Sequence, residues 1–298
     1  MTRAAVSLRF AKAPTVLRYY PRAVLARRQA CVPAGASVPR LEAAVEALAV
    51  SPGHLARYRD VCGFPQGDGL PVTYPHVLAM PLHLALMTHP AFVVRLMGLI
   101  HVANVIEWLR PLPAEGRYLA RVWLEGHRDT DRGQEFDLYT EFEDPTGVAW
   151  RETSTLLARQ RASSAQASRS ARAALRHPKP RAGEAVAETA IDAGRQVGRR
   201  YGRVSGDLNP IHIAGWGARM FGFERPVAHG MWSMARSLAA LGPDLAPGCR
   251  ISVEFKLPLF LGASARLQHW RGDDGWIFVL KDGPAQRPHL SGSVTPAG

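Results

Sequence analysis

An apolar helix followed by strand-like runs is the feature that most constrains the fold of this chain. After His229-Gly230, apolar residues recur at helical spacing, and Gly242-Pro243 is predicted to end the helix. The buried face of this helix is predicted to be Met231, Met234, Ala235, Leu238 and Leu241. Three runs typical of strands follow, with Gly272-Asp273-Asp274-Gly275 as a hairpin signal between the last two. They are Arg250–Leu257, Ala263–Arg271 and Trp276–Lys281.

The segment before this helix is dense in turn-forming residues. Ser205-Gly206-Asp207 is followed by Asn209-Pro210, and His212 comes shortly after. Pro210 disfavours helical geometry at Asn209, so the residues from Asp207 to Asn209 are predicted to form a bend. A fixed bend can aim the Asp207 carboxylate and the His212 imidazole at one point, as acid–base chemistry requires. The alternative is an ordinary surface turn with an incidental histidine.

The order of these residues distinguishes between the two interpretations. The chain contains Tyr201, then the run from Ser205 to His212, then His229-Gly230-Met231. This combination resembles the MaoC-like dehydratase family, which includes the (R)-specific enoyl-CoA hydratases. The family pattern is approximately Y-x-x-x-S-G-D-x-N-P-x-H, a loop, and H-G-M, and every fixed position is present here. The resemblance covers the C-terminal third directly and the rest of the chain more weakly.

The resemblance implies a fold, an activity and a set of site residues. The fold is the hotdog, an α+β fold in which an antiparallel sheet wraps around one long apolar helix. Asp207 and His212 are expected to be the catalytic acid–base pair, and the backbone N–H of Gly230 is expected to stabilise charge on the thioester oxygen. The expected substrate-binding residues are Asn209, Ser205, His229 and Tyr201. Asn209 is expected either to hold the bend or to contact substrate. No metal or redox cofactor is expected.

The first half of the chain carries a weaker version of the same pattern. Pro71-Val72-Thr73-Tyr74-Pro75-His76 aligns with Arg225–His229, so that His76 parallels His229 and the apolar run Val77–Met87 parallels the later helix. Strand-like runs follow at His101–Leu109, Tyr118–His127, Glu135–Phe142 and Ala149–Leu157. These features predict two tandem hotdog units, an internal duplication that forms a pseudo-dimeric double hotdog.

The first unit departs from the family pattern. It has no Asn-Pro-x-His after Asp68, and Val77 stands where the second unit has Gly230. We therefore expect this unit to lack a catalytic pair and to shape the acyl-chain tunnel, as in double-hotdog relatives. Asp68 and His76 are interpreted as remnants or as simple turn and helix-end residues. His83 and His101 are interpreted as structural histidines rather than ligands.

Four segments are expected along the chain. They are an N-terminal basic segment (1–36), a degenerate hotdog unit (37–158), a basic linker (159–184) and the catalytic unit (185–298). The N-terminal segment is expected to pack on the first unit, with a membrane-surface role as the alternative. The linker is either a flexible tether or a docking patch for coenzyme A phosphates or carrier protein. Residues 38–50 are predicted to form a strand or short helix, and residues 52–62 a helix.

The charge and the cysteine content limit which binding partners and which cellular compartment are expected. The formal net charge is +12 and the pI is about 10.3, which favours acidic partners such as coenzyme A, acyl carrier protein or nucleic acid. No recognised nucleic-acid motif is present, so nucleic acid is not expected to be the partner. The 3 cysteines are widely spaced, which fits a reducing cytoplasm and neither a disulfide framework nor a metal site. No transmembrane helix or secretory signal is expected.

These observations favour an enzyme of fatty acid metabolism. The expected reaction is the reversible dehydration of (3R)-hydroxyacyl thioesters to trans-2-enoyl thioesters. The alternative is a non-catalytic hotdog protein that binds acyl thioesters or organises a complex, since the first unit is degenerate and the charge is high. Two choices stay open. The thioester carrier is either coenzyme A or acyl carrier protein, and the protein is either a pseudo-dimeric monomer or a homodimer.

Overall fold

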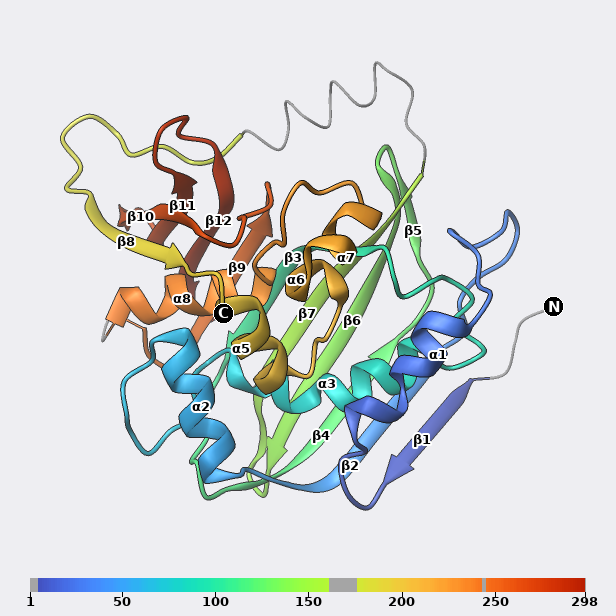
Figure 1. Cartoon of the computed structure of the whole chain (residues 1–298). Helices are drawn as coiled ribbons and strands as arrows, with labels where there is room; N and C mark the ends of the chain where they lie inside the picture. Colours follow the sequence, from blue (N-terminus) through green and yellow to red (C-terminus); the bar gives the residue numbers. More distant parts are fainter. Residues whose placement is uncertain (1–4, 161–175, 243–244, 298) are drawn as a thin grey trace.

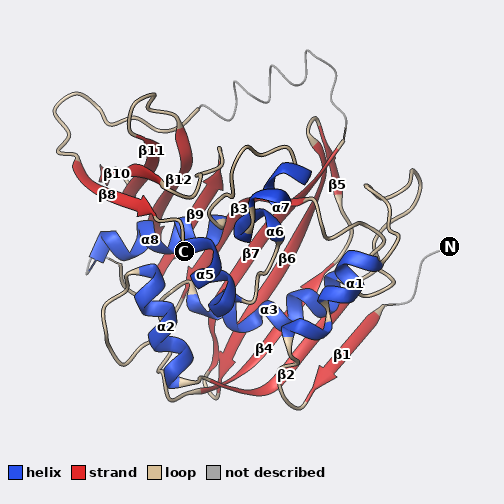
Figure 2. Cartoon of the chain, viewed as in Figure 1, coloured by secondary structure: helices blue, strands red, loops and turns tan. Residues whose placement is uncertain are grey.

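The computed structural model describes residues 5–160, 176–242 and 245–297. The strands of these residues join into one sheet of 12 strands, and the helices gather on one face of it (Figures 1 and 2). The path through the sheet is β1-β2-β4-β6-β7-β3-β9-β12-β11-β10-β8, and β5 pairs with β6. All neighbours are antiparallel except β1 and β2.

The sheet consists of a first-half part and a second-half part that meet at β3 and β9. The first-half strands are β1 (Val6–Phe10), β2 (Leu41–Ala49), β3 (Leu99–Trp108), β4 (Arg117–Leu124), β5 (Arg128–Thr130), β6 (Gly133–Asp144) and β7 (Gly147–Arg159). The second-half strands are β8 (Ala187–Ala193), β9 (Cys249–Phe255), β10 (Ala263–Gly272), β11 (Gly275–Asp282) and β12 (Pro288–Pro296). The β3–β9 register runs from Ala103 opposite Glu254 to Trp108 opposite Cys249.

The helices include one apolar central helix for each half. The first-half helices are η1 (Val16–Arg18), α1 (Tyr20–Leu25), α2 (Pro52–Cys62) and the central helix α3 (Tyr74–Met87). The second-half helices are α5 (Val197–Ser205), α6 (Pro210–Ile213), α7 (Gly215–Met220) and the central helix α8 (Gly230–Leu241). The predicted stripe of α8 is buried throughout, and Gly242 ends the helix with a φ of 65°. The two tandem α+β units are therefore confirmed.

Several segments differ from the sequence-based expectations. Residues 38–50, which were predicted as a strand or short helix, form β2. The strands β8 and β12 were not predicted, because their sequences AETAIDA and PHLSGSVTP contain few of the residues that favour strands. Their pairing with β10, β9 and β11 supplies the order that local composition does not. Most of the predicted linker, 161–175, lies outside the described residues.

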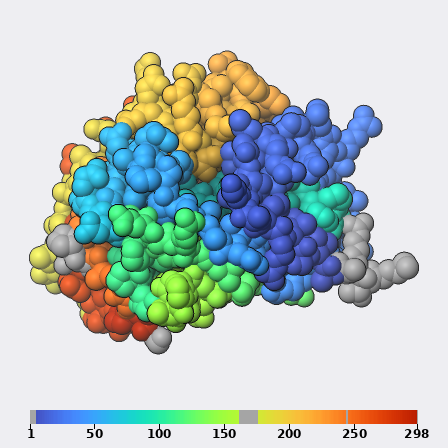
Figure 3. Space-filling model, turned by 90° about the horizontal axis from the view of Figure 1, so that it is seen from below, coloured from blue at the N-terminus to red at the C-terminus, as the bar shows by residue number. Residues whose placement is uncertain are grey.

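The N-terminal segment packs on the first half, as expected. Strand β1 extends the sheet by pairing in parallel with β2, from Val6 opposite Leu41 to Phe10 opposite Val45. Its following helices continue along the surface, and in the space-filling view these dark blue residues meet the yellow and orange residues of the second half (Figure 3). Leu17, Val24 and Leu25 remain exposed.

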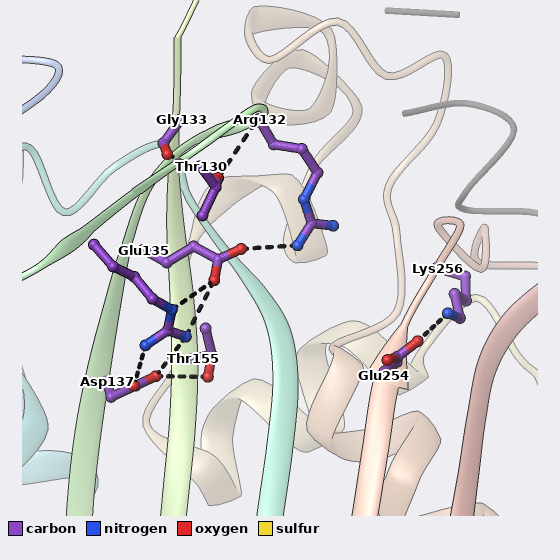
Figure 4. Close-up of polar contacts among 9 residues, drawn as sticks. Thr130, Arg132, Gly133, Glu135, Asp137, Thr155, Glu254 and Lys256 are labelled. Atoms are coloured by element: carbon purple, nitrogen blue, oxygen red, sulfur yellow. Dashed lines mark hydrogen bonds and ion pairs between the residues drawn. The ribbon is translucent and has the colours of Figure 1, made fainter. Parts of the chain in front are cut away.

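Ion pairs join the two strands of the β5–β6 hairpin to each other. Glu135 bonds Arg132 at 2.8 Å and Arg128 at 3.1 Å (Figure 4). Asp137 pairs with Arg128 as well and accepts a hydrogen bond from Thr155 Oγ1 at 2.7 Å. The same view contains the Lys256–Glu254 ion pair at the end of β9. No helix of the described residues is both long and apolar enough to span a membrane.

Candidate active site

The predicted bend forms where α5 stops. Gly206 has a φ of 76°, which glycine adopts readily, and it ends α5. Residues 206–209 are non-helical, and Pro210 then occupies the first position of α6. The Asn209 side chain caps α6 by accepting a hydrogen bond from the Ile211 N–H at 3.3 Å. Asn209 thus holds the bend, which was one of its two expected roles.

The bend brings Asp207 to two histidines. Asp207 Oδ2 lies 3.9 Å from His212 Nε2 and 3.9 Å from His229 Nε2. The two imidazoles stack with ring centroids 3.7 Å apart. Both histidine side chains are buried, whereas the Asp207 side chain is 36% exposed. Asp207 therefore forms the accessible side of the group.

The hydrogen bond that His212 makes with the backbone determines which of its ring nitrogens carries the proton. The other ring nitrogen is the one near Asp207. His212 Nδ1 lies 2.8 Å from the carbonyl oxygen of Val227, to which it can only donate. In the neutral ring Nε2 then carries a lone pair. Because 3.9 Å is too long for a hydrogen bond, Nε2 and the Asp207 carboxylate are two acceptors that flank one gap. A water molecule that donates to both fits this arrangement.

The pKa shifts favour the same protonation states. Burial works to raise the pKa of Asp207, but His229, His212 and the Asn209 N–H lower it further, so the carboxyl is ionised. Burial lowers the pKa of His212, against the opposing influence of Asp207. Burial and His212 lower the pKa of His229 to about 3. Near neutral pH the group is therefore a carboxylate with two neutral imidazoles.

The remaining predicted residues fix the bend from inside. His229 Nε2 lies 3.0 Å from the backbone oxygen of Asp207, and the buried Tyr201 ring packs on His229 at 4.9 Å. Ser205 Oγ accepts a hydrogen bond from the Asp207 N–H at 3.1 Å. The structure thus brings all the predicted site residues together around one cavity, and in it Ser205 and His229 bond the bend.

Tyr20 is a site residue that was not predicted from the sequence. Its hydroxyl donates to the Gly206 carbonyl at 2.6 Å and accepts from the Leu208 N–H at 2.6 Å. The two bonds are to the residues directly before and after Asp207, and they come from helix α1, which is distant from Asp207 in the sequence. Nothing local in the N-terminal segment indicates this contact, because it depends on β1 pairing with β2.

Gly230 begins α8 beside Asp207 and His212 in the same cavity. Its amide is among the first N–H groups of a helix, which have no acceptor within the helix. A Cβ at this position would lie 3.1 Å from the ring of Phe255. Glycine therefore allows close packing of the helix start against β9, and Gly230 lines the cavity.

The cavity that contains these groups has a volume of about 520 Å³ and draws its lining from both halves. The second half contributes the catalytic candidates, together with Phe255, Lys256 and other residues. The first half contributes mainly α3, β7 and the segment before β3, including Met80, Leu84, Met87, Leu96 and Leu156. One end is therefore polar and reactive, and much of the rest is apolar.

Two groups of side chains in the described part of the chain have the spacing of metal ligands. One is Asp207, His212 and His229, and the other is His76, His83 and Glu152. In both groups ring nitrogens already bond protein oxygens, including Val227 O, Asp207 O and Thr140 Oγ1. These hydrogen bonds occupy some of the ring nitrogens of each group, whereas His229 Nδ1 has no hydrogen-bond partner among the described residues.

His76 lies at a helix end, as one interpretation had it, and makes a contact that was not expected. Asp68 is an exposed turn residue, as one interpretation had it. His76, however, is buried in the first turn of α3, and its Nδ1 lies 2.9 Å from both carboxylate oxygens of Glu152. Glu152 was not predicted as a site residue. Its inward position follows from strand alternation, since Trp150, Glu152 and Ser154 are all buried.

Comparisons with known proteins match the second half of the chain to a family model and most of the chain to a curated protein. The family model described as "MaoC like domain" matches residues 176–290. Over 264 residues the chain is 34% identical to "3-hydroxyacyl-thioester dehydratase X" of Mycobacterium tuberculosis, and the match covers 88% of this chain and 92% of that protein.

Solved structures resemble the fold of the whole chain. The crystal structure of HtdX from Mycobacterium tuberculosis matches with a TM-score of 0.72 at 33% identity, covering 85% of this chain and 99% of that one. A second Mycobacterium tuberculosis protein, described as having a double hotdog fold, matches with a TM-score of 0.50 at 14% identity. It covers 85% of this chain and 94% of that one.

Proposed function

Because this chain belongs to the MaoC-like dehydratase family, we propose that it catalyses the reversible dehydration of (3R)-hydroxyacyl thioesters to trans-2-enoyl thioesters in fatty acid metabolism. The observation that supports this most is the pair of acceptors, Asp207 Oδ2 and His212 Nε2, 3.9 Å apart in the cavity that Gly230 also lines. This is the spacing at which one water, or one substrate hydroxyl, contacts both groups.

In the hydration direction the pair positions and deprotonates water. The water donates one hydrogen to the Asp207 carboxylate and one to His212 Nε2, and its oxygen forms the bond to C3 of the enoyl thioester. One member of the pair takes the water proton, and the C2 carbanion receives a proton from the pair. Dehydration runs these steps in reverse, with removal of the C2 proton and protonation of the departing hydroxyl.

The Gly230 amide stabilises the negative charge that develops on the thioester oxygen during the same steps. As water adds to C3, the electrons of the C2–C3 double bond move toward the thioester oxygen. An N–H at the start of α8 donates to this oxygen, and the helix dipole adds to the effect. Loss of such a donor costs about 3 kcal/mol in other oxyanion holes. These steps are proton transfers, so the proposal calls for no metal or redox cofactor.

We propose that the two halves have different roles, one in catalysis and the other in binding the acyl chain. The catalytic unit, 185–298, supplies Asp207, His212 and Gly230. The first unit, 37–158, holds the acyl chain against the apolar wall formed by Met80, Leu84 and Leu156. Since each chain then contains two paired units, a monomer already has the pairing that a single unit obtains by dimerising.

The thioester carrier is proposed to be coenzyme A or acyl carrier protein. Lys256 and Arg159 line the cavity, and the net charge of +12 favours anionic carriers. Cys31, Cys62 and Cys249 are all free thiols, which suits the reducing cytoplasm proposed as the site of action.

Hydration of crotonyl-CoA by the purified chain tests this proposal. Asp207→Asn and His212→Ala are each expected to lower kcat at least about 100-fold, in the range for acid–base groups. Exposed Asp129→Asn is the matched control and is expected to keep full activity. Equal rates in all four proteins would refute the assignment. A 3S product would refute its stereochemistry.

A further inference from the structure

A second polar cluster lies in the first-half part of the same cavity. We call His76, His83, His101, Asn104 and Glu152 the first-half cluster. Glu152 accepts hydrogen bonds from His76 Nδ1 at 2.9 Å and from Asn104 Nδ2 at 2.7 Å. His83 Nε2 bonds Thr140 Oγ1 at 2.9 Å. The His76 ring lies 5.1 Å from His83 and 6.1 Å from His101, measured between centroids.

The charges in this cluster are buried. The Glu152 side chain is 0% exposed and that of His76 is 8% exposed. Burial works to raise the pKa of Glu152, but His76 and the hydrogen bonds lower it further, so the carboxyl is ionised. Burial lowers the pKa of His83 to about 3 and that of His101 to about 4, so both rings are neutral near pH 7.

Hydrogen bonding within the cluster leaves ring nitrogens for another partner. An ionised carboxylate only accepts, so His76 Nδ1 must carry the proton toward Glu152. The hydrogen bonds of His76 with other described residues use Nδ1, which leaves Nε2 for a ligand. His101 Nε2 is buried and has no hydrogen-bond partner among the described residues. Such a buried nitrogen requires an explanation, because burial without a partner is costly.

The cluster is close to the reacting end of the cavity. His76, His83, His101 and Ser154 line the cavity that also contains Asp207. The His101 ring packs on Phe255 at 4.9 Å, and Phe255 is the ring that borders Gly230. The rings of Phe255 and His101 thus form a series of contacts from Gly230 to His76. The cluster therefore lies in the first-half region that the acyl chain occupies in the proposed function.

Polar side chains of this kind are unfavourable beside a plain hydrocarbon chain. A buried charged or polar group must be hydrogen-bonded to be tolerated, and apolar residues of the same volume often match or surpass it in stability. The neighbouring wall residues Met80, Leu84 and Leu156 are apolar, so the rest of this region follows that expectation. The cluster is thus a local exception, and three of its members, His76, His83 and His101, line the cavity.

We propose that the first-half cluster is a recognition site for a hydroxyl group on the acyl chain, beyond the reacting C2 and C3 atoms. This inference depends on the proposed function for the identity of the ligand as an acyl thioester. A hydroxyl donates its one hydrogen to the lone pair of His76 Nε2, and its oxygen is left to accept a hydrogen bond from another group. The substrate class is accordingly hydroxylated acyl thioesters.

Binding of unreactive ligands tests the site without requiring turnover. Saturated medium-chain acyl-CoA thioesters, each with one hydroxyl at a successive carbon beyond C3, are compared by calorimetry with the plain chain of equal length. At one position, or two adjacent ones, Kd is expected to be about tenfold lower than for the plain chain, which corresponds to about 1.4 kcal/mol. Equal or weaker binding at every position would overturn the proposal.

A double variant connects the preference to the cluster. The double change His76→Leu with Glu152→Leu, which avoids an unpaired buried charge, is expected to bring the ratio of the two Kd values close to one. His127→Phe is the matched control, because this first-half histidine does not line the cavity, and it should keep the tenfold ratio. A ratio that persists in the double variant would overturn the proposal. One equivalent of Zn²⁺ bound through Glu152, with no hydroxyl preference, would also overturn it.

Crotonyl-CoA hydration in the same preparation separates this inference from the proposed function. Activity on crotonyl-CoA without any hydroxyl preference leaves the dehydratase assignment standing and eliminates the recognition site. A hydroxyl preference without hydratase activity supports the recognition site and eliminates the dehydratase assignment.

Discussion

The hydroxyl of Tyr20 donates a hydrogen bond to the carbonyl of Gly206 at 2.6 Å, directly before Asp207 in the chain. It also accepts from the N–H of Leu208, directly after Asp207, at 2.6 Å. Burial, with a contribution from Asp207, raises the pKa of Tyr20, so the group remains a neutral phenol that can make both bonds. An N-terminal helix thereby holds the bend that carries the proposed catalytic carboxylate.

We predict that Tyr20→Phe lowers kcat for crotonyl-CoA hydration about tenfold and leaves KM nearly unchanged. Removal of the hydroxyl leaves two backbone groups without their partner, a loss of about 1–2 kcal/mol that acts on the position of Asp207. Steady-state kinetics separate kcat from KM. Tyr19→Phe is the control, since the neighbouring Tyr19 is also a tyrosine of this segment, is buried, and has no hydrogen bond to the bend. A Tyr20→Phe enzyme with normal kcat would exclude a positioning role.

The pH dependence of hydration follows from the directions of the pKa shifts at the site. The active form has ionised Asp207 and neutral His212, and both groups have lowered pKa values. As pH falls, activity is lost only when one of them gains a proton. The acidic limb of kcat/KM is therefore predicted below about 6.5, the ordinary value for histidine. A limb centred above that value would contradict the predicted protonation states.

Stability is predicted to fall on acidification for a separate reason. His83 and His229 are neutral in the folded chain with pKa values of about 3, whereas in the unfolded chain they gain protons near 6.5. Between these values the unfolded state binds more protons, so the free energy of unfolding decreases as pH falls. Between pH 5.5 and 4.5, each of these two histidines is expected to lower the free energy of unfolding by about 1.4 kcal/mol for each pH unit of acidification.

Urea unfolding across this range measures the effect. His83→Asn removes the titrating ring and retains a group that can bond Thr140, so the pH slope should decrease by about 1 kcal/mol per unit. His177→Asn, which replaces a half-buried histidine outside the two clusters, is the matched control. An unchanged slope in His83→Asn would mean that His83 is protonated in the folded protein.

The sequence predicted the parts of the site that are close together in the chain. Pro210 and Gly206 create the bend locally, and the helix beginning at His229-Gly230 has its own pattern. The catalytic roles expected of Asp207, His212 and Gly230 came from the resemblance of this ordered stretch to the family pattern. Both central helices were predicted because long apolar runs of helical period are strong signals. The weak strands β8 and β12 were missed because partner strands, rather than composition, stabilise them.

Contacts between distant segments were not predictable in the same way. Tyr20 lies on a short helix whose position depends on the parallel pairing of β1 with β2. Glu152 and His76 come from a strand and a helix that meet only when the sheet closes over α3. A buried acidic residue in an alternating strand is a signal that the sequence does contain. Its partner, however, is identified only by the fold.

Gly230 offers a test in which steric cause and chemical effect can be separated. In Gly230→Ala the new Cβ would approach the Phe255 ring to 3.1 Å, so the first turn of α8, with its amide, must shift. We predict that kcat for crotonyl-CoA hydration falls about 10- to 100-fold, approaching the loss of an oxyanion donor. The combination with Phe255→Leu makes room for the Cβ and should restore at least about half of that loss on a logarithmic scale. Phe255→Leu alone is the control for the change in cavity shape. If the double variant is no more active than Gly230→Ala, contact with Phe255 is not the reason that glycine is required at this position.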